Sequence, residues 1–226
     1  TNGRYPNVHS AKYTGPITLK KTTVLRVAAY EPGCSRSQVV DLTYLINEND
    51  NLNTVCLVAN PHSLFDYYDG IYATGPNASD VNPFVGANFW RNVEISASVS
   101  LFETDGSVGF SENCGLKIFG GYSRANGKKS LACMFRGKYG ASSLDYALFG
   151  DAGINSFQSF VLRAGGQDAY GSKIRDEMIT SIASQYLGLP VQRYRPTVLY
   201  INGEYWGIYF IREKLTDQYV AGNYGV

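Results

Sequence analysis

The clearest hydrophobic pattern in the chain is an alternation of apolar and polar residues over 90–103. Val93, Ile95, Ala97, Val99 and Leu101 fall on one face, and Glu94, Ser96, Ser98 and Ser100 fall on the other. A period of two places successive side chains on opposite faces of a strand. The pattern therefore predicts a half-buried β-strand.

Several other segments are strand-like, and turn residues separate them. They are rich in β-branched and aromatic residues and cover 22–30, 37–45, 54–60, 157–163, 197–201 and 205–211. Asn202 and Gly203 separate the last two, and Asn-Gly between hydrophobic runs is the strongest short hairpin signal. The almost wholly apolar segment 54–60 predicts a strand buried on both faces.

One segment, 173–187, has the spacing of a helix. Its apolar residues recur every four positions, at Ile174, Met178, Ile182 and Tyr186. We expect Ser172 to cap the first turn and Gly188 to end the helix. Because such a stripe is typical of a core-facing helix, we expect Asp176 and Glu177 to point to the flanks or to solvent.

These segments predict an α+β, β-rich fold, in which a small β-sandwich-like module precedes an antiparallel-sheet domain with one main helix. The Asn-rich linker 46–53 predicts the boundary between the module at 1–47 and the domain at 54–226. Residues 217–224 predict a further helix. Since the sequence starts in polar residues and ends without a closing element, we expect a fragment of a longer protein.

The charge balance argues against a general attraction to polyanions. Twenty Lys and Arg residues oppose nineteen Asp and Glu residues, for a net charge of +1. Any polyanion site must therefore be local, and we expect no specific nucleic-acid partner. No apolar run reaches about eighteen residues, so we expect no membrane-spanning helix.

The cysteines and histidines do not suggest a metal or hydrolase centre. The four cysteines are widely spaced without a Cys-x-x-Cys pair, and there are two histidines. We expect no metal site, whereas both buried free thiols and the disulfides of a secreted protein fit this spacing. Neither Gly-x-Ser-x-Gly nor His-Glu-x-x-His occurs, so we expect neither a triad hydrolase nor a zinc hydrolase.

A basic, glycine-rich segment carries the main functional signal. Between residues 113 and 144 there is no Asp or Glu, and the positive residues are Lys117, Arg124, Lys128, Lys129, Arg136 and Lys138. Backbone N–H groups with clustered Lys and Arg form an anion cradle. The segment fails as a P-loop, because Lys129 follows Lys128 and the next residues predict a strand. The pattern fits a strand–turn–strand hairpin that covers the phosphates of a nucleotide, as in kinases. It also fits a solvated basic hairpin at a sheet edge, or a nucleic-acid site.

Two longer stretches resemble known families. The ordered motifs GLKIFGGYSR (115–124), RGKYG (136–140), LRAGGQD (162–168) and YINGEYWGIY (200–209) resemble the N-terminal part of the spore-coat CotH kinase family. The stretch YTGPITLKKTTVLRVAAYEPGCSRSQVVDLTY resembles part of the β-module at the C-terminal end of chitobiases and hexosaminidases. That module is usually an accessory domain without catalytic residues.

The CotH resemblance implies an atypical protein kinase that uses Mg-ATP. The expected phosphate-binding residues are Gly120, Gly121, Ser123, Arg124, Lys128, Lys129 and Arg136. Lys129, with Lys128 as its rival, is expected to contact phosphate from the sheet. Glu177 or Asp176 is expected to hold that lysine.

The resemblance also sets expectations for the whole protein. The catalytic carboxylates are expected in a C-terminal lobe beyond Val226, so no catalytic residue is assigned in this chain and we expect it alone to be inactive. The parent would phosphorylate Ser or Thr of a surface or coat protein, in an extracellular, cell-surface or coat-associated location. The alternative is a non-catalytic extracellular module whose Tyr and Trp side chains stack on carbohydrate.

Overall fold

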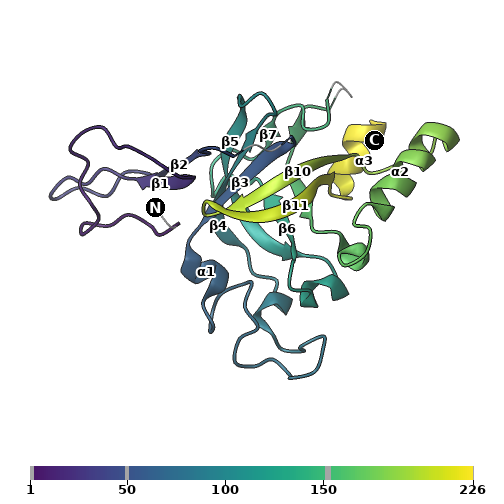
Figure 1. The fold of residues 1–226 in the computed structure, drawn as a ribbon, viewed down its shortest axis with the longest axis horizontal. Coiled ribbons are helices and arrows are strands. Elements are labelled where there is room, and N and C mark those ends of the chain that lie inside the picture. Colours follow the sequence, from purple (N-terminus) through teal and green to yellow (C-terminus); the bar gives the residue numbers. More distant parts are fainter. Residues whose placement is uncertain (1–2, 49–50, 151–153, 226) are drawn as a thin grey trace.

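The computed structural model describes residues 3–48, 51–150 and 154–225, and its main body is a closed seven-stranded barrel (Figure 1). The strands are β3 (Asn53–Ala59), β4 (Ile95–Phe102), β5 (Val108–Phe119), β6 (Ser130–Met134), β9 (Ser159–Arg163), β10 (Tyr194–Ile201) and β11 (Glu204–Glu213). Their order around the barrel is β10-β11-β9-β6-β5-β4-β3. The β-rich α+β class is confirmed, with the sheet closed on itself.

The barrel closes through one parallel pair. Strands β3 and β10 run parallel, with Thr197 opposite Asn53, whereas the other neighbours pair antiparallel. Closure leaves neither strand as a free edge. Both strands are predicted from the sequence, but the parallel pairing between them is not.

The predicted Asn-Gly hairpin joins β10 to β11. Asn202 and Gly203 have φ values of 53° and 84°, and Ile201 pairs with Glu204. Two positive φ values are what a type I′ turn requires. The Asn202 side chain also accepts a hydrogen bond of 3.0 Å from the N–H of Ala59, which ties the turn to β3. The predicted hairpin is confirmed.

The core lies inside the barrel, on alternate residues of its strands. Fully or almost fully buried side chains include Val55, Leu57, Val99, Leu101, Leu116, Leu131, Phe160, Leu162, Leu199, Tyr209 and Ile211. Burial of each large apolar side chain contributes about 1.5–3 kcal/mol. Residues between them in the sequence point outward, and the candidate site uses this outer face.

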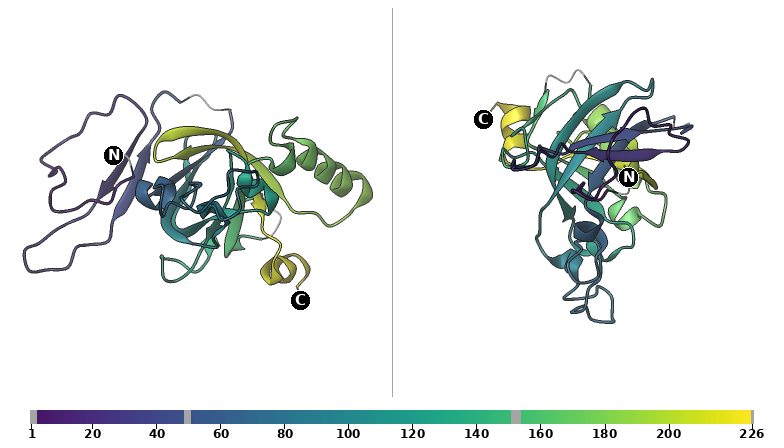
Figure 2. Two further views of the ribbon diagram at one scale, coloured as in Figure 1. Left: turned by 90° about the horizontal axis from the view of Figure 1, so that it is seen from below. Right: turned by 90° about the vertical axis from the view of Figure 1, so that its left-hand side faces the viewer.

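The N-terminal module lies at one end of the molecule (Figure 2). Its β1 (Thr23–Val27) and β2 (Val40–Tyr44) form a two-stranded antiparallel sheet. No second layer of a β-sandwich is present within residues 3–48. The Ser98 hydroxyl donates a 2.8 Å hydrogen bond to Asp41, which links the module to the barrel.

Short elements complete the fold. They are α1 (Pro61–Phe65), α3 (Asp217–Tyr224), the pair β7 (Leu144–Asp145) and β8 (Ser156–Phe157), and the 3₁₀ helices Asn88–Trp90, Tyr122–Ala125 and Gly166–Asp168. The predicted helix at 217–224 is confirmed. Within the described ranges, no helix has the length and apolar character needed to cross a membrane.

The main helix, α2 (Arg175–Leu187), forms where predicted but faces the opposite way. Met178, Ile182 and Tyr186 are 52 %, 46 % and 73 % exposed, and Glu177 is the buried residue of the helix. The expectation that the apolar stripe faces the core is therefore wrong. Charged groups attach α2 to the outer face of the barrel, from which it extends (Figure 1).

The predicted N-cap of α2 is also wrong. The Ser172 hydroxyl donates a hydrogen bond of 2.7 Å to Asp168 Oδ2, and the same oxygen accepts from the N–H of Arg175 at 3.2 Å. Asp168 thus satisfies the first turn from outside the helix. Gly188 ends α2 with a φ of 61°, as predicted.

All four cysteines are free thiols. Cys34 is exposed, and Cys56, Cys114 and Cys133 are buried. Of the two possibilities that the sequence leaves open, the structure shows thiols.

Candidate functional site

The glycine-rich segment joins β5 to β6 at one end of the barrel. Phe119 pairs with Ser130, so residues 120–129 form the connection, and the predicted strand–turn–strand is confirmed. Gly120 has a φ of 114°, and a Cβ there would lie 2.6 Å from Ser123 Oγ. Gly121 is exposed with open space beside it. Only glycine fits easily at position 120.

Lys129 supports this loop from inside. It is 4 % exposed, and its Nζ donates to the carbonyl oxygens of Arg124 and Asn126, both at 2.7 Å. The Nζ also lies 4.0 Å from the centre of the Phe89 ring. Burial lowers the pKa of Lys129 to about 8. As the side chains lie, the ammonium is engaged by the loop itself, and its contact with phosphate stays a prediction.

Arg124 has a similar structural role. Its Nε donates to the Gly120 carbonyl at 2.6 Å, and its Nη1 donates to the Phe89 carbonyl at 3.3 Å. Tyr72 adds a third support, because its hydroxyl accepts from Lys129 N–H at 2.9 Å and donates to the Gly127 carbonyl at 3.1 Å. The loop is therefore fixed by two of its own side chains and by Tyr72 from a separate segment.

Lys128 is placed differently from Lys129. It is only partly buried, and its Nζ donates to the Ile208 carbonyl at 2.8 Å and lies 4.4 Å from the centre of the Tyr209 ring. Partial burial, and then the charge of Lys173, lower its pKa to about 8. This ammonium group therefore lies beside β11.

Arg136 is not brought to the loop. Its Nε lies 3.2 Å from Glu94 Oε1, and Lys138 Nζ lies 3.3 Å from the same oxygen. Strand β6 separates Arg136 from the loop by about 20 Å, at about 3.3 Å per residue. The basic residues of the segment thus form two groups at opposite ends of the hairpin.

An ion cluster holds α2 against strands β9 and β11. Asp176 Oδ2 accepts from Arg163 Nη2 at 2.9 Å and also from Arg212 Nη1. Phe210 is paired with Arg163, so the two arginines lie two residues apart along adjacent strands and on the same face. Their neighbours Leu162 and Ile211 point into the core, which directs both guanidinium groups outward.

Glu177 is the buried acid of this cluster. It is 3 % exposed, and its Oε1 lies 3.8 Å from Arg212 Nη1. Neither carboxylate oxygen has a hydrogen-bond partner, and burial raises the pKa of the group. Among the residues that the structure describes, Asp176 and Glu177 form ion pairs with arginine and not with Lys128 or Lys129.

Arg163 and Arg212 were not predicted as site residues. The available signal was an arginine at the end of each apolar strand, in the stretches FVLR and FIRE. Gly165 and Gly166, which follow β9, have φ values of 103° and 58°. Asn126 Nδ2 donates to the Gly166 carbonyl at 3.2 Å, which joins the turn after β9 to the glycine-rich loop.

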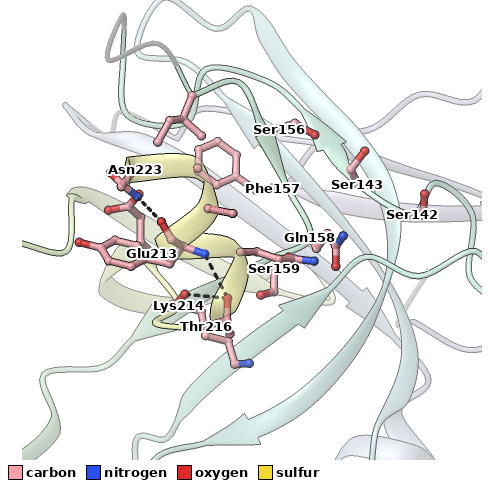
Figure 3. A pocket seen from close by; sticks show the side chains of 15 residues that line it. Ser142, Ser143, Ser156, Phe157, Gln158, Ser159, Glu213, Lys214, Thr216 and Asn223 are labelled. Carbon is pink, nitrogen blue, oxygen red and sulfur yellow. Dashed lines mark hydrogen bonds between the residues drawn. The ribbon is translucent and has the colours of Figure 1, made fainter. Parts of the chain in front are cut away.

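A pocket of about 350 Å³ lies where β9 begins and β11 ends, at Ser159 and Glu213 (Figure 3). Helix α3 forms one side of it, and Ser142, Ser143 and Ser156 lie across from α3. Glu213 is fixed in its wall, since Oε1 lies 2.5 Å from Arg193 Nη2 and 3.3 Å from Asn223 Nδ2. The remaining lining residues are Ile154, Phe157, Gln158, Ser159, Lys214, Thr216, Gln218, Tyr219, Ala221 and Gly222.

The structure shows no cluster of acids for a metal. Within 3–48, 51–150 and 154–225, no three His, Cys, Asp or Glu side chains lie together as a metal site. Asp176 and Glu177 are the adjacent acids of the ion cluster, and Glu177 contributes the unpartnered oxygens. Two carboxylates with substrate phosphates are a common Mg²⁺ environment in nucleotide sites.

Comparison with protein families gives two matches in this chain. Residues 116–225 match the family model described as CotH kinase protein, so this part of the chain is similar to that family, as the motifs predict. Residues 1–44 match the model described as Fn3 associated. The β-module predicted before the CotH segment is thereby confirmed, under the description Fn3 associated. No curated protein matches the chain.

Proposed function

We propose that this chain forms the nucleotide-binding part of a CotH-type protein kinase. The similarity of residues 116–225 to the CotH kinase family supports a kinase-like function. The observation that carries the finer proposal is the cluster of Arg163, Arg212, Asp176 and Glu177 beside the glycine-rich loop. We place this domain at 54–226, after the linker that the sequence predicts as the domain boundary.

The order of elements supports this reading. A kinase N-terminal lobe has a glycine-rich hairpin, a strand that carries a cation, and a helix whose acid pairs with that cation. Here the hairpin is β5–β6, the cation is Arg163 on β9, and the acid is Asp176 on α2. Arginine can serve in this position because its planar guanidinium stays charged and binds phosphate through two N–H groups.

The charges suit a triphosphate. Arg163 Nε and Arg212 Nε are buried without a hydrogen-bond partner, and Lys128 lies beside β11, the strand that carries Arg212. Burial raises the pKa of Glu177, the acid beside Arg212. Lys128 and Arg163 would hold the phosphates, and the backbone at Gly120, Gly121 and Ser123 would cover them.

Mg²⁺ bound with the nucleotide would supply charge neutralisation at the phosphates. The free oxygens of Glu177 are the acceptors that this cluster can offer to the ion. We propose that the base occupies the pocket beside α3, because β9 runs from Ser159 in that pocket to Arg163 in the cluster. Phe157 and Tyr219 provide aromatic surface there for a planar ring.

The proposed reaction is transfer of the terminal phosphate of Mg-ATP to a Ser or Thr hydroxyl of a surface or coat protein. An extracellular or coat-associated location is proposed on the CotH relationship alone. We assign no catalytic carboxylate among the residues of this chain.

Thermal-shift titration of the chain tests the proposal. Mg-ATP at about one hundred times its Kd should add about 2.7 kcal/mol and raise Tm by roughly 5–10 °C. Inorganic tripolyphosphate should give a smaller rise, since it contacts the cations without filling the base pocket. Lys128→Ala and Arg163→Ala should reduce both responses.

The matched control is the double variant Arg136→Ala, Lys138→Ala, which removes two basic residues from the far end of the hairpin. It should respond to Mg-ATP like the parent chain. Absence of any stabilisation by Mg-ATP or tripolyphosphate, or equal responses in all variants, would contradict the proposal.

A further inference from the structure

A second cleft lies between the N-terminal segment and α1. Its volume is about 570 Å³, and it is lined by Arg4, Tyr5, Asn60, Pro61, His62, Phe65 and Asp66. The N-terminal segment and α1 are neighbours in the view of Figure 1. Clefts at the junction of two structural units are frequent ligand sites. The proposed nucleotide site uses none of these residues.

The N-terminal wall of the cleft is firmly attached. Arg26 Nη1 donates to the Gly3 carbonyl at 2.7 Å, and Arg26 pairs with Asp41 through two further bonds of 2.7 and 3.0 Å. The Arg26 guanidinium also lies 4.1 Å from the centre of the Tyr5 ring. A Cβ at Gly3 would lie 2.4 Å from the Asn202 side chain, so the backbone packs directly on the barrel. Tyr5 is therefore preorganised.

The opposite wall is equally defined. Phe65 is 40 % exposed, and its ring centre lies 5.7 Å from that of Tyr72 and 5.8 Å from that of Trp206. Asp66 Oδ1 accepts from the N–H groups of Tyr68 and Asp69 at 2.9 and 3.1 Å. These contacts fix an exposed aromatic ring next to a carboxylate.

The chemistry of the lining fits a neutral, hydroxyl-rich ring. A pyranose has an apolar C–H face, which packs on aromatic rings, and a rim of hydroxyls, which needs both donors and acceptors. Tyr5 and Phe65 supply the aromatic surface, while Arg4, Asn60 and Asp66 supply donors and acceptors. The positive charge of Arg4 and the negative charge of Asp66 offset each other, so the cleft favours neither an anionic nor a cationic ligand.

The aromatic surface continues beyond the cleft. Tyr67 and Tyr68 follow Asp66 and are 55 % and 66 % exposed. Side chains of this kind offer stacking surface for further units of an oligosaccharide. We propose that the cleft between Tyr5 and Phe65 is a binding site for a neutral pyranose unit of a glycan, separate from the nucleotide site.

Titration calorimetry with neutral trisaccharides tests this inference. Cellotriose and triacetylchitotriose represent polysaccharide chains, and mannotriose represents a protein-linked glycan, so the arm that binds identifies the source. At least one should bind without nucleotide, and Tyr5→Ala should weaken that binding about tenfold or more. Tyr186→Ala, which removes a 73 % exposed tyrosine on α2, is the matched control and should leave it unchanged.

Two further measurements keep the result clear. Each variant is first checked for an unchanged Tm. His62→Ala, at a side chain that is 64 % exposed, is a second substitution in the cleft. In the parent chain, the binding sugar should shift the His62 imidazole NMR signals. No binding by any of the three sugars at about 10 mM, or binding unaffected by both cleft variants, would overturn the inference.

Discussion

Arg163 on β9 and Asp176 on α2 form a 2.9 Å ion pair that fastens the main helix to the outside of the barrel. Arg212 on β11 shares the same carboxylate oxygen. The helix therefore depends on a charge cluster where most amphipathic helices depend on apolar packing. The first prediction follows from this dependence.

Asp176→Ala should lower the free energy of unfolding by about 1–2 kcal/mol, because Arg163 loses its contact with Asp176 and Arg212 keeps only the 3.8 Å contact with Glu177. The expected loss of stability is small because Asp176 is 42 % exposed and water screens the ion pair. Urea unfolding gives the measurement. Glu204→Ala, on the exposed start of β11, is the control and should change stability little. Equal losses of stability in the two variants would show that Asp176 does not attach α2 to the barrel.

Glu177 should make stability depend on pH in a defined direction. Burial raises the pKa of its folded-state carboxyl above the unfolded value. The folded chain then binds the extra proton, so the contribution of Glu177 to stability falls as pH rises from below its unfolded pKa through its folded pKa.

Glu177→Gln removes this titration. Relative to the parent chain, the variant should gain stability as pH increases from 4 to 8, as measured by urea unfolding at each pH. Glu204→Gln, in an exposed position, is the control. A stability difference that is constant across this range would show that the Glu177 carboxyl is not affected by burial in this way.

Lys128 and Lys129 should differ sharply when each is replaced by methionine. Lys129→Met leaves the Arg124 and Asn126 carbonyls without their donor, so it should cost about 2–3 kcal/mol. Lys128→Met breaks one bond at a partly exposed site and should cost about 1 kcal/mol or less. Thermal unfolding of the two variants makes the comparison. The reverse order of stability would contradict the supporting role of Lys129.

Thiol labelling should distinguish Cys34 from the other cysteines. Cys34 is exposed, whereas the other three are buried, and burial raises the pKa of Cys56 to about 12. Because the thiolate is the reactive form, a chromogenic disulfide reagent should modify one thiol in the folded chain and four after denaturation. Rapid labelling of more than one thiol in the native state would contradict the buried positions.

Local features of the fold were predictable because the sequence determines them over short distances. Strand alternation around Val99 and the Asn202-Gly203 turn required no knowledge of distant residues. Barrel closure depends instead on Asn53 meeting Thr197, far away in the sequence. The orientation of α2 was mispredicted because the apolar stripe rule assumes that a core covers the helix.

The site shows the same division. Composition identified the basic glycine-rich loop, but burial decides what each cation contacts. Lys129 is enclosed by Phe89 and Tyr72, which come from a separate segment, and Arg136 is drawn to Glu94. Arg163 appeared as the last residue of a predicted strand, and only its meeting with α2 shows its place in the cluster.

The central claim is that Lys128 and Arg163 bind the phosphates of a nucleotide. Titration calorimetry of the chain with Mg-ATP, compared with the Arg163→Ala and Lys128→Ala variants, tests it most directly. The account predicts saturable binding that each substitution weakens about tenfold or more, equivalent to about 1.4 kcal/mol, while the Arg136→Ala, Lys138→Ala control keeps the parent affinity. No heat of binding, or the same affinity in all four proteins, would contradict it.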